Sequence, residues 1–129
     1  MLGRNSYEPE ELENARATAK KQLADWRSSG AGGDLETSYF NGLVLALDRP
    51  FVHRIRKMTG KDTNPLSEVE MLVESLLDND GVLREIKVIR YDPDKSVLGL
   101  QIGDRIALTA DDFEELSAAF LKDVEQKSD

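Results

Sequence analysis

The residues that this chain lacks or has few of limit its possible chemistry: it has no cysteine, a single histidine and no long apolar run. Without cysteine there are no disulfides, no thiol nucleophiles and no cysteine-ligated zinc or iron–sulfur sites. The longest apolar stretch, residues 43–47, is far shorter than the roughly 18 residues that a membrane-spanning helix needs. The first 13 residues are polar and acidic, unlike a secretory signal. We therefore expect a cytoplasmic protein without a membrane segment.

Charge is abundant but unevenly distributed along the chain. The net charge is −8, yet residues 35–63 carry five positive and three negative side chains, whereas residues 64–129 carry seven and sixteen. An acidic protein is repelled by phosphate backbones and by anionic membranes, so general nucleic-acid binding is disfavoured. The positive excess of residues 35–63 could still contact one anion or an acidic partner.

The N-terminal third reads as a helical arm attached to one domain. We expect disorder over residues 1–6, an arm over 7–28 and a single α+β domain over 34–126. Pro9 suits the first position of a helix, where its missing N–H costs nothing. The apolar stripe at spacings of three and four consists of Leu12, Ala15, Ala19, Leu23 and Trp26. This arm could dock on the body of its own chain or on a neighbouring subunit.

The middle of the chain predicts two or three further helices. A helix that Asp34 can cap runs to Asp48, where Pro50 predicts either a kink or a stop followed by a restart at Pro50, and we favour the restart. Asn64 then caps a helix that follows it directly. Its wide apolar face predicts the centre of the core and consists of Leu66, Val69, Leu72, Val73, Leu76 and Leu77.

The C-terminal third predicts strands and a last helix. Residues 84–91 are rich in branched and aromatic side chains, residues 96–102 alternate, and residues 106–108 suggest a short third strand. Turn sequences at 92–95 and 103–104 separate them, and Thr109 caps the last helix. The predicted fold class is therefore α+β, with four or five helices and a small three-stranded antiparallel meander before the C-terminal helix.

One group of residues is the candidate binding site: a basic face on the predicted helix after Pro50 and in the turn that follows. It consists of Arg49, His53, Arg54, Arg56, Lys57 and Lys61. Such a face could bind phosphate, nucleic acid or an acidic protein surface, or it could be a solvated surface paired with the chain's own carboxylates.

No pattern indicates a catalytic, metal or cofactor site. His53 has cationic helical neighbours, and no serine nucleophile is signalled beside it. The Asp78–Gly81 stretch matches the acidic core of an EF-hand, but Leu76 and Lys87 would then occupy the first and last ligand positions, so calcium binding fails. No Gly-x-Gly-x-x-Gly or Walker motif is present. We expect no metal and no cofactor.

Two resemblances can be stated on particular residues. The stretch 98–106, Leu-Gly-Leu-Gln-Ile-Gly-Asp-Arg-Ile, resembles the signature of swapped-hairpin (AbrB-type) DNA-binding regulators, which implies an intertwined dimer. More broadly, the chain resembles a small bacterial, mainly actinobacterial, family without assigned function in residues 47–55, in the Asn64-Pro65-Leu66 sequence and in the Gly-Asp-Arg-Ile-x-Leu-Thr stretch of residues 103–109. That second resemblance implies no mechanism.

These observations lead to three functional hypotheses. The favoured one is a non-enzymatic protein–protein interaction or regulatory protein, which forms a homodimer or other oligomer through its first helix or its exposed apolar stripes. The first alternative is an anion- or nucleic-acid-binding module that uses the basic face of residues 49–61. The second alternative is a small enzyme that depends on His53.

Overall fold

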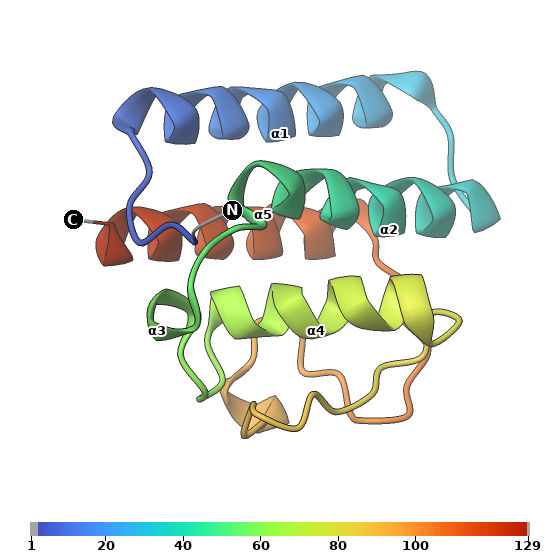
Figure 1. Cartoon of the computed structure of the whole chain (residues 1–129). Coiled ribbons are helices and arrows are strands. Elements are labelled where there is room, and N and C mark those ends of the chain that lie inside the picture. Colours follow the sequence, from blue (N-terminus) through green and yellow to red (C-terminus); the bar gives the residue numbers. More distant parts are fainter. Residues whose placement is uncertain (1–2, 129) are drawn as a thin grey trace.

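The protein is a stack of helices against which a long irregular segment packs. A computed structural model describes residues 3–128. The helices are α1 (Pro9–Ser29), α2 (Asp34–Asp48), the 3-10 turn η1 (Arg49–Phe51), α3 (Arg56–Thr59), α4 (Pro65–Asp78), the 3-10 turn η2 (Pro93–Lys95) and α5 (Ala110–Lys127). Helices α1, α2 and α4 each pack on α5, and α2 also packs on α4 (Figure 1).

The predicted α+β class is wrong, because no sheet forms within the described residues. Their only β pairings are three isolated bridges, Arg4–Arg54, Asp62–Arg90 and Val82–Arg105. The segments predicted as a three-stranded meander instead form an irregular chain between α4 and α5. In Figure 1 this chain runs along the side of α4 that faces away from α2. The helical part of the prediction holds, with five α-helices in residues 3–128.

Side chains from the helices explain why the meander does not form. The Glu68 carboxylate of α4 accepts hydrogen bonds from the backbone N–H groups of Val97 (2.7 Å) and Leu98 (3.0 Å). The Asn41 amide of α2 donates to the Ile106 carbonyl and accepts from the Leu108 N–H. Backbone groups held in this way cannot pair with a neighbouring strand. The side chains of Ile106 and Leu108 are buried in the core, and those of Val97 and Leu98 are partly buried against it.

Local signals placed the starts of α1, α4 and α5 correctly, whereas Asp34 is the first residue of α2 and Gly33 occupies the cap position. Helix α1 begins at Pro9, as predicted. The Asn64 side chain accepts from two N–H groups at the start of α4, and the Thr109 hydroxyl accepts from the Asp112 N–H at the start of α5. Helix α2 stops at Asp48 as predicted, but the restart at Pro50 is wrong, since only the single turn η1 follows. The chain after η1 makes a turn and then the short helix α3.

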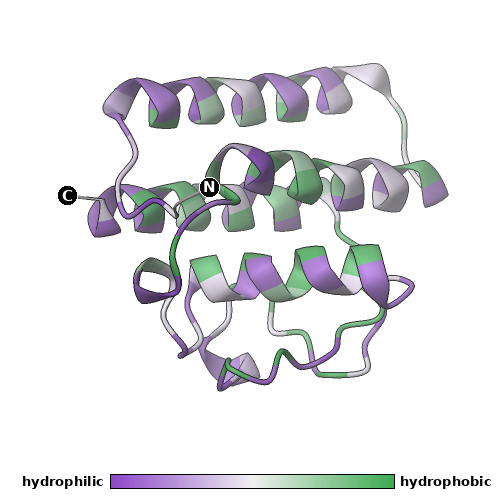
Figure 2. Ribbon diagram, in the orientation of Figure 1, coloured by the Kyte–Doolittle hydropathy of each residue, from purple (hydrophilic) through white to green (hydrophobic). Residues whose placement is uncertain are grey.

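The core lies between α5 and the other helices. Its largest fully buried side chains are the phenylalanines Phe40, Phe51, Phe113 and Phe120. The predicted arm is part of this core, because the apolar stripe of α1 is buried and α1 packs on α5 of its own chain. Figure 2 shows the apolar residues of α2 and α5 on their inward-facing sides. The predicted apolar face of α4 is correct for Leu66, Val69 and Leu72 but wrong for Leu77, which is 65% exposed.

The chain before α1 ties the two ends of the protein together. Residues 1–2 of the predicted disordered segment lie outside the described residues. The backbone of Arg4 donates to the His53 carbonyl and accepts from the Ile55 N–H. The Tyr7 N–H donates to the Ser128 hydroxyl, and the Tyr7 hydroxyl donates to the Phe51 carbonyl. The N-terminal segment therefore fixes the chain between η1 and α3 against the end of α5.

The Glu68 carboxyl makes the stability of the fold depend on pH. Glu68 is only 3% exposed, and burial raises its pKa above the ordinary value of 4.5 although the two N–H donors oppose this rise. The folded chain therefore holds this proton more tightly than the unfolded chain. The resulting contribution to stability is present below the unfolded pKa and is lost as the pH rises through the folded pKa.

Substitution of Glu68 by glutamine tests this dependence. An amide NH₂ cannot accept a hydrogen bond, so one backbone N–H of the 97–98 pair loses its acceptor, and we expect Glu68→Gln to be about 1–3 kcal/mol less stable at acid pH. Because only the wild type ionises at this position, its advantage should shrink as the pH rises above the ordinary glutamate pKa of 4.5 and through the raised pKa of the folded chain. Urea unfolding across that range measures the difference. The exposed Glu115→Gln is the control, and a difference for Glu68→Gln that does not change with pH would contradict the assignment.

Candidate functional site

The structure separates the predicted basic face into buried and exposed members. Arg54 is buried, and its guanidinium lies 2.7 Å from the Asp48 carboxylate, with side chains only 5% and 8% exposed. It also donates to the carbonyls of Phe51 and Leu66 and to the Thr59 hydroxyl. Four of its five side-chain N–H groups are thus bound inside the protein. The prediction that Arg54 belongs to an exposed anion-binding face is therefore wrong.

The other five members lie on the surface but do not share a helix. Arg56 pairs with Glu70 of α4 at 2.6 Å. The remaining four have no ion pair within residues 3–128, and they are Arg49, His53, Lys57 and Lys61. They are spread over η1, the turn after it, α3 and the following loop, because the helix predicted from Pro50 onward does not form. Anion binding by these four side chains stays a prediction.

His53 does not stand in a catalytic arrangement. Its side chain is exposed, and only its backbone carbonyl is engaged, as acceptor for the Arg4 N–H at 2.7 Å. Within residues 3–128, no carboxylate accepts a hydrogen bond from the His53 ring and so orients it. The enzyme hypothesis therefore gains no geometric support from His53, and it stays a prediction.

A groove along α4, here called the α4 groove, lies beside the basic residues. It has a volume of about 370 Å³ and lies between α4 and the segment from the end of α2 to α3. Its lining consists of Asp48, Val52, Arg54, Arg56, Thr59, Glu70, Val73, Glu74, Leu77 and Asp78. The buried Arg54–Asp48 pair forms part of this lining and joins the two walls, since Arg54 also donates to the Leu66 carbonyl of α4.

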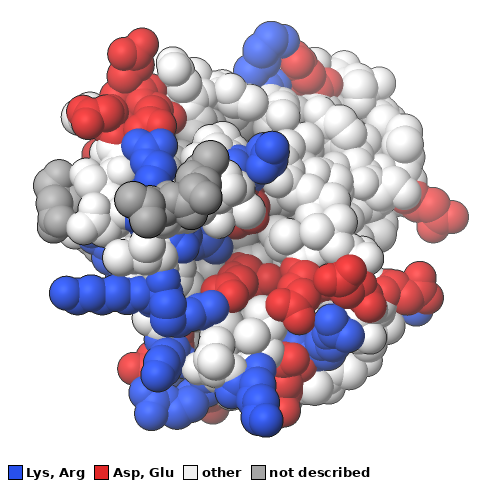
Figure 3. Space-filling model, viewed as in Figure 1, with Lys and Arg blue, Asp and Glu red and all other residues white. Residues whose placement is uncertain are grey.

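Exposed apolar side chains and carboxylates meet in the α4 groove. Leu77 is 65% exposed and Val52 is 43% exposed, two of the five exposed large apolar residues in the described chain. Glu70, Glu74 and Asp78 follow each other at four-residue intervals on α4, so they form one stripe along the helix. Figure 3 shows an acidic band over α4 and basic residues over α3 beside it. The groove therefore carries exposed apolar side chains on both walls and a predominantly acidic edge along α4.

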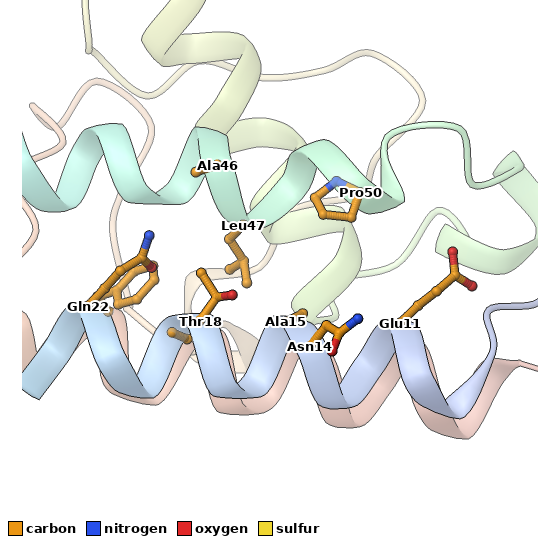
Figure 4. A pocket seen from close by; sticks show the side chains of 10 residues that line it. Glu11, Asn14, Ala15, Thr18, Gln22, Ala46, Leu47 and Pro50 are labelled. Carbon is orange, nitrogen blue, oxygen red and sulfur yellow. The ribbon is translucent and has the colours of Figure 1, made fainter.

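A second hollow lies between α1 and α2 (Figure 4). Its volume is about 190 Å³, and Leu47, Pro50 and Phe113 contribute apolar surface to it. The polar side chains on its α1 side are Glu11, Asn14, Thr18 and Gln22. Glu11 is already bound to the Arg4 guanidinium and to the Glu8 N–H, and these bonds lower its pKa. This hollow is below the roughly 300–1,000 Å³ of typical ligand sites.

The part of the chain that the structure describes contains neither a metal-binding cluster nor a membrane-spanning helix. Within residues 3–128, no three histidine, aspartate or glutamate side chains converge as metal ligands would. None of the helices there combines the length and the apolar character needed to cross a bilayer. Comparisons of the chain with protein-family models, with characterised proteins and with solved structures find no match.

The α4 groove was missed by sequence reasoning for a definite reason. Val73 and Leu77 continue the apolar spacing of α4, so they were assigned to the core together with Leu66 and Leu72. The available signal was the width of that apolar face, which exceeds what packing against one or two helices requires. The irregular segment 79–109 covers one side of α4 and leaves Leu77 uncovered. Only the tertiary structure shows which side stays open.

Proposed function

We propose that this chain is a cytoplasmic, non-enzymatic protein-binding protein, and that the α4 groove is the surface on which its partner docks. The observation that supports this most is the joint exposure of Leu77 and Val52 on the two walls of one groove. Apolar side chains that are exposed together, within a polar edge, are typical of protein interaction surfaces. The proposal keeps the interaction role expected from the sequence and changes the surface that performs it.

The partner is either another protein or a second copy of this chain. Self-association through the apolar stripe of α1 loses its basis, because Leu12, Leu23 and Trp26 are already buried in the core. For a homodimer, we propose the α4 groove as the interface instead. The groove is well supported for docking, since the Arg54 bonds to Asp48, Thr59 and Leu66 hold its walls at a fixed separation. A preformed surface binds with a smaller entropic cost than one that must be ordered.

Site-specific photo-crosslinking tests the proposal. A photoreactive phenylalanine analogue is placed at Leu77, and the full chain is expressed in the cells that naturally make it. We expect one crosslinked species, identified by mass spectrometry, that contains either a defined second protein or two copies of the 14.4 kDa chain. The matched control position is Leu35 on α2, which is 58% exposed but outside the groove.

The two positions separate docking from random collision. The proposal predicts that the species formed from position 77 is absent from position 35, because short-range crosslinking requires a lasting contact. It also predicts that Val52→Asp in the opposite wall reduces the yield from position 77 several-fold, since a charge is costly to bury in an interface. Equal products from both positions, or no product from position 77, would reject the α4 groove as a docking surface.

A further inference from the structure

The charges around the α4 groove indicate which partner fits it. This inference rests on the proposed function and names the chemistry of the docked segment. We propose that the α4 groove binds a basic amphipathic helix of another protein, with apolar side chains on Leu77 and Val52 and lysine or arginine side chains along the acidic stripe of α4.

The carboxylates of α4 are neutralised at one end of the groove and not at the other. Glu70 pairs with Arg56 at 2.6 Å. Glu74 has a looser contact with Arg84 at 3.2 Å, and both side chains are more than a third exposed. Asp78 has no ion pair within residues 3–128. The groove thus offers increasing negative charge toward the C-terminal end of α4, where the helix dipole adds further negative potential.

The arrangement of side chains on α4 suits a helix better than an extended segment. Val73 and Leu77 lie four residues apart, and so do Glu74 and Asp78, so an apolar row and an acidic row run side by side along the helix. A partner helix with leucines at three- and four-residue spacing and cations beside them matches both rows at once. Helix α4 has 14 residues and is therefore about 21 Å long, which a partner of about 14 residues can follow.

The dipoles also favour one orientation of the partner. The negative C-terminal end of α4 attracts the positive N-terminal end of a neighbouring helix. The opposite end of the groove carries Arg56, with Lys57 beside it in α3, and suits the negative C-terminal end of the partner. An antiparallel partner helix satisfies both ends.

A basic partner is favoured over a second copy by the overall charge. Each copy carries a net charge of −8, so two copies repel each other at long range, whereas a basic segment is attracted toward the acidic stripe. A nucleic acid is disfavoured by the same sign argument, because its phosphates would face Glu74 and Asp78. The partner class that fits both the apolar side chains of the walls and the acidic row is a cationic protein helix.

A synthetic peptide probe tests the partner class on the intact chain. The probe is a fluorescent 14-residue peptide of leucine and lysine whose leucines recur at helical spacing, and its counterpart has glutamate in place of every lysine. We expect the lysine peptide to bind and to become more helical on binding. Its affinity should fall as the salt concentration rises, and the glutamate peptide should bind at least about tenfold more weakly. Fluorescence anisotropy and circular dichroism measure both effects.

Paired variants separate the groove from general attraction to an acidic protein. Leu77→Gln and Asp78→Lys should each lower the affinity for the lysine peptide about tenfold or more. The first removes an apolar anchor, and the second reverses the unpaired charge. The matched controls Leu35→Gln and Asp94→Lys change an exposed leucine and an exposed aspartate outside the groove, and they should stay within about twofold. All four sites are exposed, so thermal unfolding should confirm that each variant is folded.

The outcomes distinguish this inference from the proposed function. Equal weakening by the groove variants and their controls, or equal binding of the two peptides, would overturn the basic-helix inference. If position 77 nevertheless crosslinks a defined partner, the protein-binding proposal stands and only the partner class is wrong. A position-77 product made of two copies of the chain would likewise reject the basic helix in favour of self-association. Failure of both the crosslink and the peptide would reject both proposals.

Discussion

Substitution of Arg54 by alanine is expected to lower the free energy of unfolding by about 3–5 kcal/mol, because it leaves the buried Asp48 carboxylate without its partner. The carbonyls of Phe51 and Leu66 lose a donor at the same time. Native domains are stable by only about 5–15 kcal/mol, so this one change removes a large share. Urea unfolding followed by circular dichroism measures the loss.

The matched control is Arg56→Ala. Arg56 also pairs with a carboxylate, that of Glu70, but both side chains are more than a quarter exposed. Exposed ion pairs contribute about 0–1 kcal/mol, so this variant should be nearly as stable as the wild type. In the double variant Asp48→Ala/Arg54→Ala, the loss should be smaller than the sum of the two single losses, since no lone charge stays buried. An Arg54→Ala protein as stable as Arg56→Ala would refute the structural role.

This role has a practical consequence for any test of anion binding. A charge reversal at Arg54 would place two carboxylates together in a buried site and would unfold the chain rather than probe its surface. Lys57 and Lys61 are exposed and have no ion pair within residues 3–128, so substitutions there leave the fold intact. The basic residues therefore have to be tested without Arg54.

Substitution of Phe40 by alanine is expected to cost about 3–5 kcal/mol through loss of apolar contact and creation of a cavity. Phe40 is fully buried on α2. Its ring centroid lies 5.3 Å from that of Trp26 on α1, 5.1 Å from Tyr39 and 5.6 Å from Phe113 on α5. The side chain thus joins three helices. Chemical unfolding monitored by the fluorescence of Trp26, the only tryptophan, measures the loss.

An exposed leucine on the same helix provides the control for Phe40. Leu35→Ala removes apolar atoms from a side chain that is 58% exposed, so its effect should stay within about 0.5 kcal/mol. A loss below about 1.5 kcal/mol for Phe40→Ala would mean that α1, α2 and α5 are not joined through this cluster. The Trp26 signal adds a check, because its ring stacks on Tyr39 at 5.2 Å and should become more mobile when Phe40 is removed.

The Arg54–Asp48 pair bears on both the stability of the fold and the shape of the proposed binding groove. Arg54 and Asp48 lie in the lining of the α4 groove and also fix its two walls. Changes there would weaken partner binding only by unfolding or loosening the site. Leu77 and Asp78 lie at the open edge, where substitution changes recognition and leaves the core intact. Substitutions at Leu77 and Asp78 therefore test recognition separately from stability.

The sequence by itself determined the features that depend on near neighbours in the chain. The starts of α1, α4 and α5 follow from Pro9, Asn64 and Thr109, because capping uses groups within three or four residues. The stop of α2 before Pro50 is equally local. The inner stripe of α5 was also predictable, because its apolar period is unbroken from Phe113 to Val124.

The tertiary structure alone decided the fold class and the site. The branched residues after position 83 had a strand-like pattern, but Glu68 and Asn41 bind their backbone groups, and a sequence pattern cannot show such distant competitors. Arg54 was expected on the surface and is buried, whereas Leu77 was expected in the core and is exposed, for a similar reason. Arg54 is buried because it pairs with the buried Asp48 carboxylate at the end of α2. Leu77 is exposed because no element covers its side of α4. Burial depends on which elements meet in space, and residue spacing along one helix does not contain that information.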